Sequence, residues 1–219
     1  MLRSIISFSS ICSIIGGSTM GLYQILHPHR DAHSVLDHPY ALIHDLGMLA
    51  LSLLGLGIIG VYLFLYAEAR SSRLIVFLFF LTLIGSIFEV GALFWDGYFN
   101  PFAAKFMPEL QTSGHNHNFI HQYYSIFGLS IFFLPVTWIL FIAGQIATGI
   151  LLIRSRKFGL LSGVLIIAGA PLFGLQLFAP LWMETTGAII LGLGHLTMGF
   201  TLYTKIAHPK NRLNTVIHF

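Results

Sequence analysis

Long apolar runs constrain the fold of this 219-residue chain more than any other feature. Residues 50–66 and 74–94 are apolar almost throughout, and Glu89 is their one charged residue. A helix that crosses the hydrocarbon core of a bilayer needs roughly 20 mostly apolar residues, whereas a membrane β-barrel shows short segments of alternating polarity. The sequence therefore predicts an all-α fold, an integral membrane helix bundle.

The composition agrees with this class and excludes others. Hydrophobic residues make up 56% of the chain and charged residues only 9%, against about 25% charged in ordinary soluble domains. The net charge of +3 comes without a Lys/Arg cluster that could follow a phosphate backbone, so nucleic-acid binding is not expected. The single cysteine, Cys12, excludes an intrachain disulfide and any multi-cysteine metal site.

Apolar runs of sufficient length predict one transmembrane domain, 1–219, with six spans. The expected spans are 5–26, 40–67, 73–97, 123–153, 158–180 and 184–205. The first span follows Arg3 as a signal peptide would, but it extends to Leu26 without a clear cleavage site, so we expect a retained helix.

The distribution of basic residues predicts the orientation, because cytoplasmic loops of membrane proteins are enriched in Lys and Arg. With the N-terminus inside, nine of the eleven basic residues are cytoplasmic, and only Arg30 and Lys105 are outside. The nine are Arg3, Arg70, Arg73, Arg154, Arg156, Lys157, Lys205, Lys210 and Arg212. Both termini are thus expected in the cytoplasm of a bacterial or archaeal cell, with the chain in the plasma membrane.

Histidines show the opposite asymmetry. Eight of the eleven lie in or beside the two predicted outer loops, and several carboxylates accompany them. These histidines are His27, His29, His33, His38, His44, His115, His117 and His121. The pattern predicts a His/carboxylate surface at the outer face.

A weak internal repeat also emerges from self-comparison. Placing His44 on His121 places His38 on His115, and a second match aligns Glu89 with Gln176. Spans 2–3 and 4–5 would then be two hairpins related by an axis along the membrane normal.

The histidines and carboxylates suggest a metal site on this surface. His117 and His121 are spaced i, i+4, so a helix would present both imidazoles on one face. Together with His44, Glu89 and Asp96 they form the predicted ligand set. Imidazole and carboxylate ligands without thiols favour Zn, Cu(II) or Fe. In the competing interpretation, these histidines are simply solvated among lipid headgroups.

Haem is the second cofactor that the pattern allows. His44 and His121 would lie at similar depth on different helices, as the two axial ligands of haem b require.

Two ionisable residues, Glu89 and His195, lie deep within spans. Glu89 is expected about 12 Å and His195 about 16 Å from the outer end of their helices. Ionisable groups at this depth are costly unless they are paired or face a cavity, so both are candidates for a proton relay. Alternatively, each is a neutral, hydrogen-bonded core residue.

Three functions remain open on this basis. The first is an outward-facing His/carboxylate site that binds a transition metal or haem, with redox chemistry as one use of the bound group. The second is a proton-coupled small-molecule or ion transporter or sensor that uses Glu89 and His195. The third is an accessory membrane subunit that contacts lipid and pairs through glycine-rich helix faces with another chain or a second copy. A membrane enzyme is also conceivable, although no nucleophile is identifiable.

Overall fold

The protein is seen here in a computed structural model that describes residues 1–27, 39–68, 72–106, 133–175 and 180–207. All regular structure in this part of the chain is helical, which confirms the all-α prediction. The long helices are α1 (Leu2–Leu26), α2 (Pro39–Glu68), α3 (Arg73–Phe94), α7 (Phe133–Ser155), α8 (Leu160–Gly174) and α9 (Leu181–Ala207). A π-helical turn, η2 (Trp95–Phe99), and the short α4 (Asn100–Phe106) continue α3.

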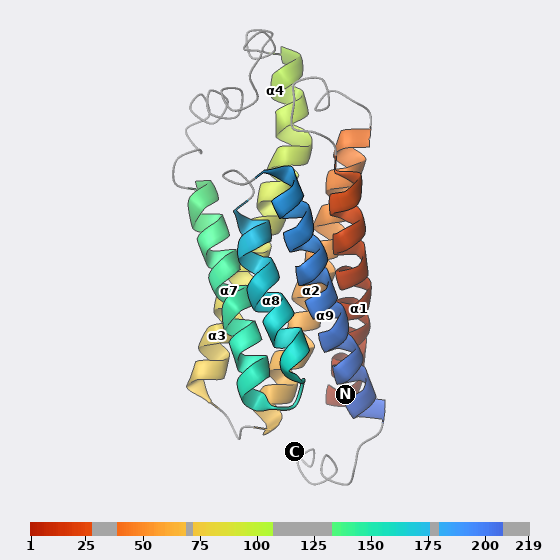
Figure 1. Cartoon of the computed structure of the whole chain (residues 1–219), viewed down its shortest axis with the longest axis vertical. Helices are drawn as coiled ribbons and strands as arrows, with labels where there is room; N and C mark the ends of the chain where they lie inside the picture. Colours follow the sequence, from red (N-terminus) through yellow and green to blue (C-terminus); the bar gives the residue numbers. More distant parts are fainter. Residues whose placement is uncertain (28–38, 69–71, 107–132, 176–179, 208–219) are drawn as a thin grey trace.

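The six long helices form a closed ring in which neighbours along the described chain are also neighbours in space (Figure 1). Helix α1 packs against α2, α2 against α3, α3 against α7, α7 against α8, and α8 against α9. Helix α9 returns along α1 and closes the ring. The end where α1 stops and α2 begins is the predicted outer end, and α4 extends beyond the bundle there.

Within the described ranges, five helical segments are long and apolar enough to cross a membrane. They are Leu2–Leu26, Pro39–Glu68, Arg73–Phe102, Pro135–Ser155 and Leu181–Ala207. Large apolar side chains on the outside of the bundle, such as Phe77 and Ile87 of α3, are exposed as lipid contact requires. The multi-pass membrane character of the chain follows from these lengths and this composition.

The predicted count of six spans is not confirmed. Helix α8 has 15 residues, about 22 Å at the α-helical rise, which is shorter than a typical span. The prediction had the helix at 158–180, and residues 176–179 of that range lie outside the described part of the chain. The internal repeat also stays a prediction, because His115, His121 and Gln176 lie outside the described part of the chain.

Glycines allow the closest helix contacts. A Cβ added to Gly17 of α1 would collide with the backbone oxygen of Gly192 in α9, and a Cβ on Gly192 would collide with that of Gly17. Gly187 packs in the same way against α8. The glycine-rich face of α9 that we considered for pairing with another chain is therefore occupied within this chain at these positions.

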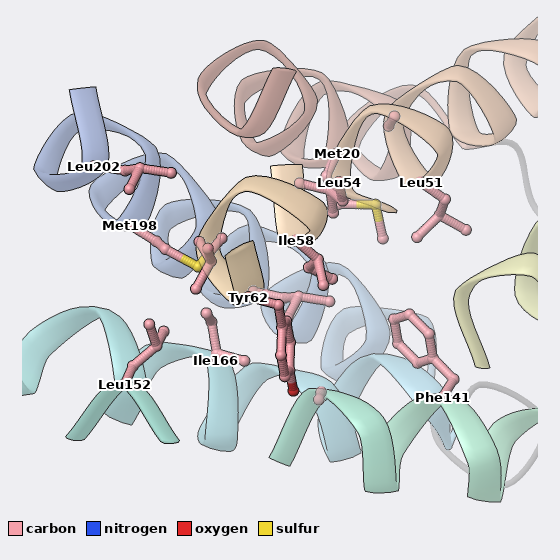
Figure 2. Close-up of a cluster of buried hydrophobic side chains, with 14 of the residues drawn as sticks. Met20, Leu51, Leu54, Ile58, Tyr62, Phe141, Leu152, Ile166, Met198 and Leu202 are labelled. Carbon is pink, nitrogen blue, oxygen red and sulfur yellow. The ribbon is translucent and has the colours of Figure 1, made fainter. Parts of the chain in front are cut away.

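The interior of the ring is filled mainly with large apolar side chains, several of them labelled in Figure 2. Tyr62 of α2 brings a hydroxyl into this layer, 3.2 Å from the hydroxyls of both Thr82 and Thr148. Thr82 and Thr148 also bond to the Gly144 backbone oxygen. These bonds join α2, α3 and α7 in the half of the bundle away from the outer end.

Helix α3 ends differently from the expected regular span 73–97. Its α-helical geometry stops at Phe94, and the next five residues form the π-helix η2. Such a turn holds one extra residue, which changes the direction of the side chains that follow it. Asp96 lies inside this turn, so its direction differs from the one that a continuous α-helix would give it.

Candidate metal centre

Three potential metal ligands from different segments meet near the outer end. They are His27, directly after α1, His44 in the second turn of α2, and Asp96 in η2. One ligand atom from each residue lies within 4.8 Å of the others. Both histidines are buried and Asp96 is partly exposed. The closed ring thus brings together three segments that are far apart along the chain.

The hydrogen bonds of His44 define what its ring can bind. Its Nδ1 lies 2.8 Å from the backbone oxygen of Tyr40, and because that oxygen can only accept, Nδ1 carries the proton and donates. Its other nitrogen, Nε2, faces Oδ2 of Asp96 at 3.2 Å. Two lone pairs at this distance repel each other, so a cation belongs between them, either a proton on Nε2 or a metal ion.

Asp96 is oriented by bonds to its other oxygen. Oδ1 accepts a hydrogen bond of 2.7 Å from the Tyr40 hydroxyl and another from the side-chain amide of Asn100. Oδ2 is thereby directed at His44. Tyr40 binds both residues, His44 through its carbonyl and Asp96 through its hydroxyl. Metal-binding histidines and carboxylates are typically held by such outer-shell partners.

The π-helix η2 also packs directly against His44. Gly97 lies directly against His44, and a Cβ added to Gly97 would come within 2.5 Å of the His44 Cβ. Trp95 and Phe99 stack their rings at 4.2 Å on the same turn. Since π-helical turns occur frequently at functional sites, η2 is an independent indication that the placement of Asp96 matters.

Aromatic rings enclose the two histidines. The ring centroids of His27 and His44 are 4.9 Å apart, and the ring of Tyr40 is 4.3 Å from that of His44. Tyr23 of α1 contacts both imidazoles edge-on, at 5.5 and 6.2 Å. This enclosure lowers the local dielectric constant and strengthens the interaction of a bound cation with the Asp96 carboxylate.

Asp45 forms a separate contact on the rim. Its Oδ1 accepts a hydrogen bond of 2.6 Å from the exposed Tyr98 of η2. Asp45 thus ties α2 to η2 beside the cluster of His27, His44 and Asp96 without belonging to it.

The structure brings together two of the five predicted metal ligands, His44 and Asp96. His117 and His121 lie outside the described residues, and so does the haem pairing of His44 with His121. Glu89 is fully buried on α3 and is not a member of the cluster. It lies seven residues before Asp96, about 10 Å deeper in the bundle.

His27 was predicted as part of the outer His/carboxylate surface but not as one of the five ligands, and Tyr40 was not predicted to support the site. A signal for His27 was present, because it immediately follows the first span and so comes to the depth at which the second span, with His44, begins. Tyr40 binds Asp96 through its hydroxyl and His44 through its backbone oxygen. Sequence spacing alone does not predict such a double contact.

His195, the other relay candidate, lies in the interior with a different partner. Its Nε2 is 2.9 Å from Oε1 of Gln145 in α7, and its backbone oxygen accepts a bond of 2.8 Å from Ser13 of α1. His195 therefore connects three helices, and Gln145 is the side-chain partner that the structure gives it.

Comparison with known proteins adds no assignment. No protein-family model matches the chain, and neither the curated proteins nor the solved structures contain a significant match.

Proposed function

We propose that this chain is a multi-pass membrane protein that binds a divalent transition-metal ion at its outer end, with His27, His44 and Asp96 as ligands. The observation that carries the proposal is the 3.2 Å separation of His44 Nε2 and Asp96 Oδ2, with Nδ1 of His44 already donating to Tyr40. A tetrahedral ion with ligand distances of about 2.1 Å holds its ligand atoms about 3.4 Å apart. The two atoms are thus spaced as one ion would require.

The donor set determines the kind of ion. Two imidazoles and one carboxylate suit Zn, Cu(II) or Fe(II), and the lack of a cysteine ligand disfavours Cu(I). Bound Cu or Fe would give the site redox activity, whereas bound Zn would not. His117 and His121 remain candidates for additional ligands from the outer loop.

A small ion fits this site better than haem does. An axial ligand needs open space in front of its coordinating nitrogen for the porphyrin plane. In front of His44 Nε2 lies Asp96, and the ring of His27 is 4.9 Å away. Haem ligation by His44 would require both side chains to move away.

The second candidate function is proton-coupled transport or sensing through Glu89 and His195. It is favoured by the full burial of both side chains within spans, where ionisable groups are costly and commonly functional. The polar bond from His195 to Gln145 also crosses the interior of the ring. Flux into vesicles that depends on a proton gradient and disappears in Glu89→Gln would support this function.

Metal titration of the detergent-purified protein tests the primary proposal. The wild type should bind about one ion per chain, and Asp96→Asn should lose most of that affinity because the carboxylate charge at the ion is gone. Asp45→Asn is the matched control, since Asp45 lies next to His44 in sequence but bonds Tyr98 on the rim. A wild type that binds no transition metal, or equal losses in both variants, would contradict the proposal.

A further inference from the structure

Gln24 of α1 is a buried polar residue that is not one of the three proposed ligands. Its side chain is 2% exposed, and neither its amide oxygen nor its amide nitrogen has a hydrogen-bond partner in the described structure. Among the residues that the structure describes, Gln145 is a second glutamine buried to this degree, and it bonds His195. A buried amide without partners lowers stability, so a glutamine at this position calls for a functional explanation.

The packing of α1 places Gln24 on the side that faces the ring interior. Gly16 packs against the backbone of α2, and Gly17 packs against that of α9, so the interior lies between these two directions. Gln24 follows Gly17 by seven residues, nearly two full turns, and follows Met20 by four. Met20 is fully buried in the core cluster shown in Figure 2. Gln24 therefore lies above Met20 on the inward face.

The same helix brings Gln24 next to the metal cluster. His27 follows three residues later, and side chains at this spacing on a helix are neighbours with Cβ atoms about 5–6 Å apart. Tyr23, the residue before Gln24, contacts the rings of both His27 and His44. Gln24 thus lies just under one helical turn inward from His27, one of the three ligands.

The three ligands of the cluster leave further coordination positions open, and a solvent ligand would fill one of them. His27, His44 and Asp96 offer three ligand atoms, and an ion with three protein ligands typically takes its fourth from water. Such a water needs a hydrogen-bond partner in a buried site, and a glutamine amide can both donate and accept. One water molecule on the ion would therefore supply both the fourth ligand and a hydrogen-bond partner for the Gln24 amide.

We infer that Gln24 is a further member of the metal centre, whose side-chain amide hydrogen-bonds the water or hydroxide held on the fourth position of the ion. This inference rests on the proposed metal-binding function and adds to it the residue that positions the non-protein ligand. In the metal-free protein Gln24 lowers stability, and in the metal-bound protein it contributes to affinity.

Gln24→Met and Gln145→Met form a matched pair that separates this role from a structural one. Each replaces a buried glutamine by an apolar side chain of similar length. Thermal unfolding of the metal-free proteins and titration with Zn²⁺ and Co²⁺ provide the readouts, and the Co²⁺ absorption spectrum reports the coordination number.

For Gln24→Met we expect an unfolding temperature of the metal-free protein equal to or above that of the wild type, because an unpartnered amide is removed. Its metal affinity should fall about tenfold or more, as when other outer-shell partners are lost, and its Co²⁺ spectrum should change. Gln145→Met should show the reverse: a lower unfolding temperature, because His195 loses its partner, and an unchanged metal affinity.

The outcomes distinguish this inference from the proposed function itself. A wild type that binds the metal, together with unchanged affinity and spectrum in Gln24→Met, would overturn the inference and leave the metal centre standing. A wild type that binds neither ion would overturn both. If Gln24→Met does not fold, Gln24→Glu decides: the added negative charge beside the ion should tighten binding, and unchanged affinity would overturn the inference.

Discussion

Gly97→Ala tests the contact on which the candidate centre depends. The added Cβ would lie 2.5 Å from Cβ and 3.0 Å from Cγ of His44, whereas carbon atoms in contact are ordinarily about 3.5–4.0 Å apart. Either His44 or η2 must therefore move by about 1 Å. Both neighbouring atoms belong to the root of the imidazole side chain, so a terminal rotation cannot relieve the clash.

The displacement should affect both stability and metal affinity. Overpacking of this kind costs about 1–3 kcal/mol. Moving His44 by about 1 Å away from Asp96 also disturbs a pair of ligand atoms now 3.2 Å apart, and disturbed ligand orientation lowers metal affinity about 10–100-fold. Thermal unfolding without metal and Zn²⁺ titration measure the two effects separately.

Gly91→Ala is the control for this prediction. Gly91 lies six residues earlier, on α3, and a Cβ there would meet no neighbouring atom within 4 Å. Because alanine favours a helix interior over glycine by about 0.5–1 kcal/mol, this variant should be slightly more stable than the wild type and bind metal equally well. Wild-type affinity in Gly97→Ala would refute the reasoning that η2 and His44 together form the site.

Three further predictions follow from the same geometry. Tyr40→Phe removes the hydroxyl that donates to Asp96, so metal affinity in a Zn²⁺ titration should fall about tenfold while the helix content measured by circular dichroism stays the same. Lowering the pH should weaken binding, because protons compete with the ion for His27 and His44; titrations at two pH values in weakly coordinating buffer should show proton release on binding, and equal affinities would contradict imidazole ligation. Thr82→Val removes a buried hydroxyl that bonds the Gly144 oxygen, so thermal unfolding should show a loss of about 1–3 kcal/mol with unchanged metal affinity.

The helical fold could be predicted because its main determinant is local. Membrane-spanning segments reveal themselves by length and apolarity, and α1, α2 and α9 lie close to the expected ranges 5–26, 40–67 and 184–205. The end of the third span could not be predicted. The π-helical turn at Trp95–Phe99 depends on the packing of Gly97 against His44, two residues more than 50 positions apart in the chain.

The candidate site could be predicted only in part. The accumulation of histidines pointed to the end of the bundle where the cluster lies, and His44 and Asp96 belong to this cluster. Which residues meet, however, depends on which helices are neighbours. His27 joins because α1 packs along α2. Glu89 is not a member because it lies about 10 Å deeper on α3 than Asp96. A hydropathy pattern predicts neither which helices are neighbours nor how deep a given side chain lies in the bundle.

X-ray absorption spectroscopy of the metal-loaded protein identifies the ligand atoms of the ion and so decides whether these residues bind it. We expect a first shell of nitrogen and oxygen at about 2.0–2.2 Å, with outer-shell scattering from two imidazoles, and loss of one imidazole contribution in His44→Ala. A sulfur shell, a porphyrin pattern, or an unchanged spectrum in His44→Ala would contradict a centre formed by His27, His44 and Asp96.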